Sequence, residues 1–203
     1  PEVRKYLEEN NKLTEEYFKD SKELQKKLFN EVKSKIKLTD ESLKFKDDRY
    51  FYWTKTVEKG NYGKYLRQKI DSKDVETYFD GDKEKKLSGS KYFGLGSISV
   101  SPDDQLISYS IDLKGSEYYD IFLRNIANNK IIEKKIQNTS GSIVWNLNSR
   151  SFFYIPLDKF HRSKKIYRHV LGTPLENDKL IFEEKDDSFS VSISLSSDEK
   201  FLI

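Results

Sequence analysis

Residues 96–126 read GSISVSPDDQLISYSIDLKGSEYYDIFLRNI, a run of short apolar segments separated by turn residues. The apolar and aromatic runs predict strands at Ser97–Val100, Leu106–Ile111 and Tyr118–Asn125, followed by a fourth at Ile131–Ile136. The connection Ser101-Pro102-Asp103-Asp104 predicts a type I turn, because proline presets the backbone angle that the second position of this turn needs. Four short strands with short connections indicate an antiparallel, all-β unit.

The turn and the strand after it recur four times along the chain. The copies begin at Asp47 (DDRYFYW), Asp103 (DDQLISY), Asn148 (NSRSFFY) and Asp198 (DEKFLI), at steps of 56, 45 and 50 residues. A repeat of this length with several strands per copy is typical of β-propeller blades, which bury their faces by stacking on one another. Because the last copy stops at Ile203 inside its strand, we expect about three four-stranded blades and the start of a fourth.

The other copies show similar strand patterns. The first predicts strands at Tyr50–Thr56, Lys64–Ile70 and Val75–Phe79, before the polar stretch Asp80–Ser90. The third predicts strands at Ser142–Trp145, Phe152–Ile155, Lys165–Val170 and Lys179–Phe182. The fourth begins at Phe189–Ser194. These patterns favour a propeller over a sandwich.

Residues 1–37 predict helix. Apolar and small residues recur at three- and four-residue steps and predict one buried stripe, made of Tyr17, Ser21, Leu24, Leu28, Val32 and Ile36. We expect a break near Asn10-Asn11, with Thr14 as N-cap of the second, longer helix. The predicted organisation is a helical arm over residues 1–40 and an incomplete propeller over residues 41–203.

Composition excludes several classes of protein. The formal charge is +3, and 30 of the 37 basic residues are lysines spread among 34 acidic ones, which argues against nucleic-acid binding. Cysteine is absent, so no disulfide framework or thiol nucleophile exists. No apolar run is long enough to span a membrane, and no signal-peptide pattern is present. We therefore expect a soluble, cytoplasmic protein.

Groups that carry chemistry are few. The two histidines, His161 and His169, belong to no metal-binding or nucleophile motif, and we interpret both as structural. Gly94-Leu95-Gly96 lacks the rest of a phosphate-binding fingerprint, so we interpret it as a turn into a blade. The acidic pairs are interpreted as turn residues that bond local backbone, namely Asp47-Asp48, Asp103-Asp104 and Asp186-Asp187.

Aromatic residues are more informative about the core. Trp145 and the run Phe152-Phe153-Tyr154 alternate within predicted strands. An aromatic ligand-binding surface is one reading, but alternation within a repeated strand favours packing between blades. We found no cofactor or metal site in the sequence.

Four segments resemble a known family. They are PEVRKYLEENN at the start, LFNEVKSKIKLTDESL, residues 96–126, and NTSGSIVWNLNSRSFFYIPLDKFHRSKKIYRHVLGTPLENDKLIFEEKDDSFSVSIS. They are similar to oligopeptidase B (protease II), the trypsin-like branch of the prolyl oligopeptidase family of serine peptidases. The stretches KIYRHVLG (Lys165–Gly172) and DKLIFEEKDD (Asp178–Asp187) are the most specific. The resemblance covers essentially the whole chain.

The resemblance implies a seven-bladed propeller that caps an α/β-hydrolase domain. In that family a Ser-Asp-His triad in the hydrolase domain cleaves short peptides after Lys or Arg. The hydrolase domain would lie beyond Ile203, so the resemblance implies no catalytic residue in this chain. We expect the 203-residue fragment to be inactive by itself.

The resemblance also implies a role for the propeller, which excludes large substrates and rocks against the hydrolase domain to admit small ones. The facing loops would lie near Ser90–Gly96 and Leu113–Glu117, with Lys91 and Glu117 as candidate interdomain ion-pair residues. The expected partners are therefore the hydrolase domain and short basic peptides. Exposed blade edges would favour self-association of the fragment. A non-catalytic propeller that binds other proteins is the alternative.

Overall fold

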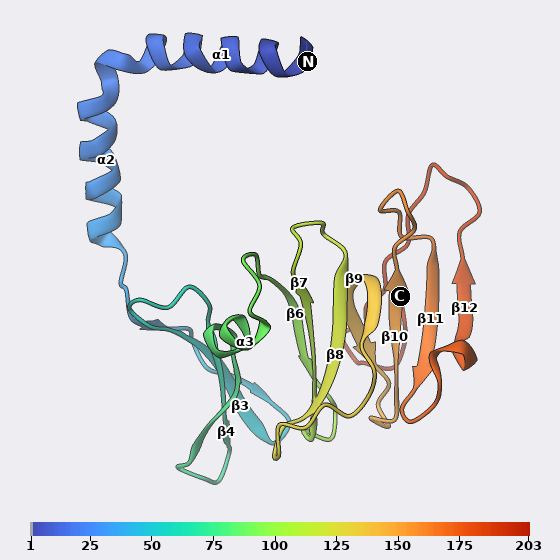
Figure 1. The fold of residues 1–203 in the computed structure, drawn as a ribbon. Helices are drawn as coiled ribbons and strands as arrows, with labels where there is room; N and C mark the ends of the chain where they lie inside the picture. The colour runs from blue at the N-terminus through green and yellow to red at the C-terminus, as the bar shows by residue number, and fades with distance from the viewer. Residues whose placement is uncertain (1) are drawn as a thin grey trace. The chain divides into compact units, whose positions relative to one another are not determined.

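The computed structural model describes residues 2–203 and is mainly β, with helices at the N-terminus (Figure 1). The chain divides after Thr77 into two compact units. The first contains helices α1 (Glu2–Phe18) and α2 (Lys22–Lys35), joined by η1 (Lys19–Ser21), and strands β1 (Asp40–Glu41), β2 (Phe45–Asp47), β3 (Tyr50–Thr56) and β4 (Lys64–Lys69). Strand β5 (Val75–Asp80) contains the division. The mainly β class and the preceding helical arm are as the sequence predicts.

The helical arm differs from the prediction in its break. Helix α1 continues through Asn10, and the interruption is the short 3₁₀ turn at Lys19–Ser21. The Asn10 amide donates to the Tyr6 carbonyl at 2.9 Å, and the Thr14 hydroxyl donates to the Asn10 carbonyl at 2.9 Å. Both polar side chains therefore bond one turn back along the same helix, which is why neither ends it.

The predicted apolar stripe of the arm is not buried within this chain. Its large members are exposed, from Leu28 at 51% to Tyr17 at 80% of their surface. In the sheet of the first unit, strands follow the order β1-β3-β4-β5, and β2 also pairs with β3. Trp53 is 4% exposed there, and its indole N–H donates to Glu41 Oε2 at 3.0 Å.

The second unit holds one open, seven-stranded antiparallel sheet in the order β12-β11-β10-β9-β8-β7-β6. Its elements are α3 (Gly81–Ser88), β6 (Gly94–Val100), β7 (Leu106–Asp112), β8 (Tyr119–Asn125), β9 (Ile136–Trp145), β10 (Ser151–Pro156), β11 (Lys165–Val170), η2 (Leu175–Asn177) and β12 (Lys179–Glu183).

Strand β9 pairs with two neighbouring strands. Its first part pairs with β8 through Ile136 and Thr139, and its second part pairs with β10 from Thr139 to Trp145. Gly141, at φ 89°, lies inside this strand. We call β6–β8 the second blade and β10–β12 the third blade, with β9 shared between them.

Two predicted strands are wrong. Residues 131–135 make only an isolated bridge, Arg124 to Ile131, because Glu133 instead binds His169 and Gly172. The segment Phe189–Ser194 forms no strand; its backbone contacts are isolated hydrogen bonds, among them the bond from Val191 N–H to the Ser163 carbonyl at 2.9 Å and those between Ser194 and Ile203 at 3.1 and 2.9 Å.

The repeated turns share one geometry. In the second copy Asp104 N–H donates to the Ser101 carbonyl at 2.8 Å across Pro102, which confirms the predicted turn. The equivalent bonds join Ser149 to Asn146 at 2.9 Å and Glu199 to Ser196 at 2.8 Å. The residue that follows the turn Asp or Asn has positive φ in all four copies: Asp48 at 42°, Asp104 at 59°, Ser149 at 57° and Glu199 at 58°.

Aromatic residues fill the core of the second unit on both faces of the sheet. Phe152, with no exposed surface, packs edge-on against Trp145 and belongs to a cluster with Tyr154. Phe153 faces the other way, in a cluster with Ile155 and Ile166. The alternation therefore reflects core packing, as the sequence indicates.

Candidate functional site

Several connections of the second unit gather at one end of the seven-stranded sheet, where the β7–β8 and β10–β11 hairpins rise together in Figure 1. We call this end the hairpin rim and define it by Ser90–Phe93, Leu113–Tyr118, Leu157–Lys164 and Glu184–Phe189. The repeated turns lie at the other end, since they connect the opposite ends of the strands. The rim holds both loops that the resemblance assigned to the surface facing the hydrolase domain, and it is the candidate site.

The two loops that the resemblance assigned to the facing surface are neighbours on the rim. Ser90 Oγ donates to the Leu113 carbonyl at 3.1 Å. The ring of Tyr92 lies over Gly115, where a Cβ would be 3.6 Å from Tyr92 Cε2. Segments 23 residues apart in sequence are thus held as one surface.

Asp112 organises the Leu113–Tyr118 loop. Its carboxylate, almost completely buried, accepts hydrogen bonds from the N–H groups of Lys114, Gly115 and Glu117 at 2.7–3.1 Å. Burial alone would raise the pKa of Asp112, but these hydrogen bonds outweigh it and hold the pKa below its usual value. Glu117 is exposed, at φ 59°, and Lys91 is also exposed on the neighbouring segment. Both candidate residues therefore lie on the rim.

Helix α3 leads into the rim, and the sequence reading missed it. Asp80 caps its N-terminus by accepting from Lys83 N–H at 3.0 Å, and Gly89 ends it at φ 62°. Glu84 on this helix pairs with Arg124 of β8 at 2.6 Å, with both side chains about nine-tenths buried. The cap and the terminal glycine were the signals that would have found this helix.

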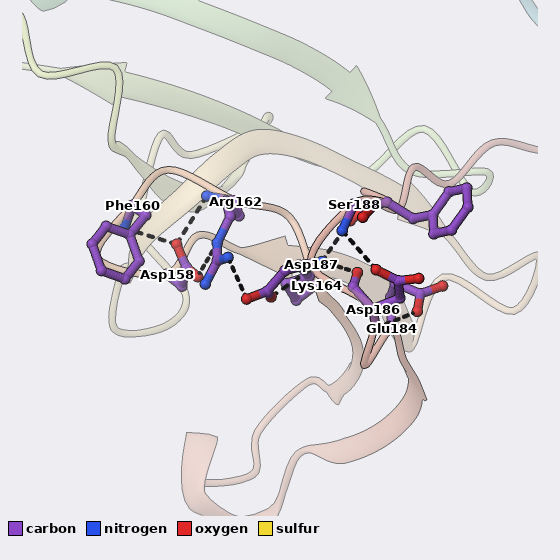
Figure 2. Close-up of polar contacts among 9 residues, drawn as sticks. Asp158, Phe160, Arg162, Lys164, Glu184, Asp186, Asp187 and Ser188 are labelled. Carbon is purple, nitrogen blue, oxygen red and sulfur yellow. Dashed lines mark hydrogen bonds and ion pairs between the residues drawn. The ribbon is translucent and has the colours of Figure 1, made fainter.

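The Leu157–Lys164 segment is built on Asp158 (Figure 2). Asp158 Oδ1 accepts from the N–H groups of Phe160 and Arg162 at 2.8 and 3.0 Å, and Oδ2 accepts from Arg162 Nε at 2.9 Å. The Arg162 N–H, followed by that of Phe160, lowers the pKa of Asp158. The Tyr118 hydroxyl donates to the Asp158 carbonyl at 2.7 Å, which ties this segment to the Leu113–Tyr118 loop.

Two cations join this segment to Glu184–Phe189 (Figure 2). The Arg162 guanidinium pairs with Asp187 at 2.9 Å, and Asp187 followed by Asp158 raises the pKa of Arg162. The buried Lys164 ammonium donates to the Phe189 carbonyl at 2.6 Å and also to the Asp186 carbonyl. Asp187 is thus an ion-pair residue, whereas the sequence reading made it a local turn residue.

The rim presents large apolar side chains on these fixed loops. Phe160 is 64% exposed, and its ring lies beneath Lys159 and Arg162 at 5.0 and 5.1 Å. Phe189 is 62% exposed and Tyr92 is 49% exposed. Sequence reading did not single out these residues, because their exposure depends on how the loops are folded.

The histidines and the glycine that the sequence analysis considered have structural roles. His161 packs against Tyr118 with ring centres 3.9 Å apart, and His169 is buried on β11. A Cβ at Gly96 would clash with Ser110 Oγ and lie 2.9 Å from Tyr119, so this glycine serves close packing. Among residues 2–203, no group of three or more histidine or acidic side chains is suited to hold a metal ion.

Comparison with known proteins identifies the family to which this fold belongs. The family model described as "Prolyl oligopeptidase, N-terminal beta-propeller domain" matches residues 1–203. The chain belongs to this family. The open sheet with its repeated turns is therefore part of a prolyl oligopeptidase propeller, as the sequence predicts.

The curated relatives of this propeller domain are peptidases. Dipeptidyl aminopeptidase BI of Pseudoxanthomonas mexicana is 30% identical over 216 residues, which cover 99% of this chain and 30% of the relative. Protease 2 of Moraxella lacunata is 25% identical over 207 residues, with the same coverage of 99% and 30%. The chain thus spans about 30% of the length of these relatives.

Solved structures of the prolyl oligopeptidase family have the same fold over the whole chain. Oligopeptidase B from Leishmania major superimposes with a TM-score of 0.83 at 26% identity, covering 100% of this chain and 29% of that one. The closed form of oligopeptidase B from Trypanosoma brucei, with covalently bound antipain, gives 0.80 at 31% identity, covering 100% and 28%. In these homologues the propeller domain is joined to a C-terminal hydrolase domain.

One further property concerns membranes. Within the described residues, 2–203, no helix combines the length and the apolar character that crossing a bilayer requires.

Proposed function

We propose that this chain is the propeller part of a cytoplasmic serine oligopeptidase whose hydrolase domain cleaves short peptides after Lys or Arg. The propeller gates access to the active site and excludes large substrates, while the triad lies in the hydrolase domain. The similarity to two oligopeptidase B structures over the whole chain supports this branch of the family. The peptidase names of the curated relatives support the reaction class.

The hairpin rim is the observation that carries the proposal. Its loops are fixed internally by Asp112, Asp158 and Lys164, so their exposed side chains are presented without further ordering. Preorganised aromatic and charged side chains favour docking, because less conformational entropy is lost on contact. We propose that the rim faces the hydrolase domain, with Lys91 and Glu117 forming ion pairs across the interface.

The first experiment measures substrate choice in the full-length protein. Reporter peptides with Lys or Arg before the scissile bond should be cleaved, and matched peptides with Ala or Pro at that position should be cleaved far more slowly. With substrates of increasing length, activity should fall sharply once the substrate is a folded domain. Equal cleavage after Pro or after Ala would reject the Lys/Arg assignment.

The second experiment tests the rim as the docking surface. Phe160→Ala in the full-length protein should weaken closure and raise KM for short peptides, and should also admit longer ones. Leu147→Ala is the matched control, since Leu147 is 55% exposed on a repeated turn at the other end of the sheet. Identical kinetics for both variants and the parent protein would show that Phe160 is not part of the interface.

The alternative function is a non-catalytic propeller that binds other proteins through its loops. It predicts that the full-length protein has no hydrolase domain, or has one with an incomplete triad. The reading frame after Ile203 distinguishes the two. A G-x-S-x-G segment followed by Asp and His would favour the peptidase.

A further inference from the structure

Strand β11 carries an arginine whose charge has no partner in this part of the protein. Arg168 is half-buried, and its Nε is buried without a hydrogen-bond acceptor among residues 2–203. No acidic side chain of the described chain forms an ion pair with it. Arginine stays charged in folded proteins. A buried charged group without a counter-charge is strongly unfavourable, so this position calls for an anion.

The neighbours of Arg168 on the same face of the sheet supply no anion. Arg168 lies opposite Phe153 on β10 and opposite Lys179 on β12. Phe153 is 7% exposed and belongs to an apolar cluster. Lys179 places a second positive charge opposite the first, which is unfavourable in a sheet. Glu183, the acidic residue of β12, pairs with Lys165 at 3.2 Å. The third blade therefore leaves two cations beside an apolar cluster.

The repeat shows what this position receives in the first blade, which contains β3–β5. Tyr52 and Phe153 are each the sixth residue of their copy of the repeat. Arg67 of β4 lies opposite the first of these residues, and Arg168 lies opposite the second. Arg67 Nε pairs with Glu76 Oε2 at 2.7 Å, and the Arg67 side chain is only 7% exposed. An arginine at this position of a blade is therefore buried against a carboxylate.

The face that carries Arg168 is the one on which the fourth blade begins. Val191 and Ile193 pack against the apolar cluster that contains Phe153. The Val191 N–H donates to the Ser163 carbonyl at 2.9 Å, which ties the start of this blade to the connection between β10 and β11. This chain spans about 30% of the length of its curated relatives. The rest of the fourth blade is therefore the segment in position to cover the arginine.

The second and third blades show which part of a blade covers this position. Leu123 of β8 is the equivalent residue, since it lies opposite Ser108, the sixth residue of its copy. Leu123 is fully buried in one cluster with Phe152 and Tyr154, the fifth and seventh residues of the next copy. In the last copy the fifth residue is Leu202, and the seventh comes after the end of this chain. The continuation of this strand is thus the part that covers the arginine.

We propose that Arg168 anchors the fourth blade to the third by pairing with an Asp or Glu from the segment that follows Ile203. The carboxylate accepts from the buried Nε and from a terminal N–H of the same guanidinium, which is the paired geometry that arginine presents to carboxylates. Its negative charge also offsets the repulsion between Arg168 and Lys179. The anchor rests on the proposed function in one respect only, namely that the chain continues through the propeller of a longer protein.

Chemical footprinting of the full-length protein tests the anchor. Phenylglyoxal, which modifies accessible guanidinium groups, is applied to the folded protein, and the modified arginines are quantified by mass spectrometry. Arg168 should react at least about tenfold more slowly than Arg150, which is exposed on a repeated turn, because one charge-assisted hydrogen bond is worth about this factor. Equal reactivity of the two arginines would overturn the proposal. Protection of Arg168 that appears only at high protein concentration would also overturn it, because the partner would then be a second copy.

Amide substitutions then identify the acid. Each Asp or Glu of the fourth blade after Ile203 is replaced in turn by Asn or Gln, which keeps the shape of the side chain and removes its charge. One variant should raise the reactivity of Arg168 by about tenfold and leave that of Arg150 unchanged. If no variant does so, a carbonyl or a bound water holds the guanidinium, and the proposal is wrong.

A double-mutant cycle in the full-length protein measures whether the two groups interact. Arg168→Met leaves the carboxylate buried without a partner and should lower the urea midpoint, whereas Arg150→Met should leave it unchanged. Once the acid has been replaced by its amide, Arg168→Met should lower the midpoint clearly less. Losses that simply add would contradict the pairing. If Arg168→Met does not fold, the footprint of the amide variants still decides the question.

The outcome separates the anchor from the proposed function. A full-length protein without a complete fourth blade would refute the proposed function, whereas a complete fourth blade in which no acid protects Arg168 would refute the anchor alone. No arm of the experiment measures peptidase activity, so the cleavage specificity of the hydrolase domain plays no part in the result.

Discussion

The backbone N–H of Asp103 donates a hydrogen bond of 3.0 Å to Ser149 Oγ, although 46 positions separate the two residues. Both belong to the repeated turn, one copy apart. The turn that closes the first hairpin of one blade therefore also contacts its counterpart in the next blade.

Ser149→Ala should lower the free energy of unfolding by about 1 kcal/mol, because the half-buried Asp103 N–H loses its acceptor. Urea unfolding followed by tryptophan fluorescence measures this. Glu199→Ala, at the equivalent position of the last copy, is the control and should change stability less. Equal effects of the two substitutions would show that the contact between turns contributes nothing.

Glu199→Gly should stabilise the chain by about 0.5–1 kcal/mol. Glutamate at φ 58° carries left-handed strain that glycine does not, and this gain exceeds the added entropy of the unfolded chain. The urea midpoint should rise, whereas Glu199→Ala should leave it unchanged or lower. A fall with glycine would mean that the side chain makes a compensating contact.

Asp112→Asn should destabilise the second unit in a pH-dependent way. The folded pKa of Asp112 is lowered, so its carboxylate contributes stability above the unfolded pKa and loses it as pH falls through the folded value. Urea unfolding from about pH 7 to about pH 3 should show the parent and the variant converging in acid. A difference that is constant with pH would contradict this.

Gly96→Ala should cost about 1–3 kcal/mol, because the new methyl group would clash with Ser110 Oγ and lie 2.9 Å from the Tyr119 ring. Thermal or urea unfolding reports the loss. Gly63→Ala is the matched control, since its Cβ would lie 3.7 Å from Tyr65, an ordinary contact. Similar losses at both sites would argue for a general glycine effect instead of a clash.

Local chemistry explains which parts of the fold were predictable. Pro102 and the Asp or Asn residues of the turns act within a few residues, so the turns followed from sequence. The strand Tyr50–Thr56 was predicted with its bounds, because its apolar run is flanked by turn signals on both sides.

The features that escaped prediction depend on partners far along the chain. Segment 131–135 has strand-like residues, but its Glu133 is hydrogen-bonded to His169, which lies 36 positions further along the chain. Arg162 and Asp187 meet only because two rim segments lie together, so neither could be assigned a partner from spacing alone. Thr14 resembles a helix cap, yet the bond of its hydroxyl to Asn10 is available only once the helix continues.

Strand β9 has a consequence for how such proteins can be divided. Since Ile136–Thr139 pairs with β8 and Thr139–Trp145 pairs with β10, the repeat visible in the sequence does not coincide with the hydrogen-bonded module. Cutting or circularly permuting the chain inside β9 would remove a paired strand from the second or the third blade. Excision of a single blade should therefore fail when the cut lies within β9.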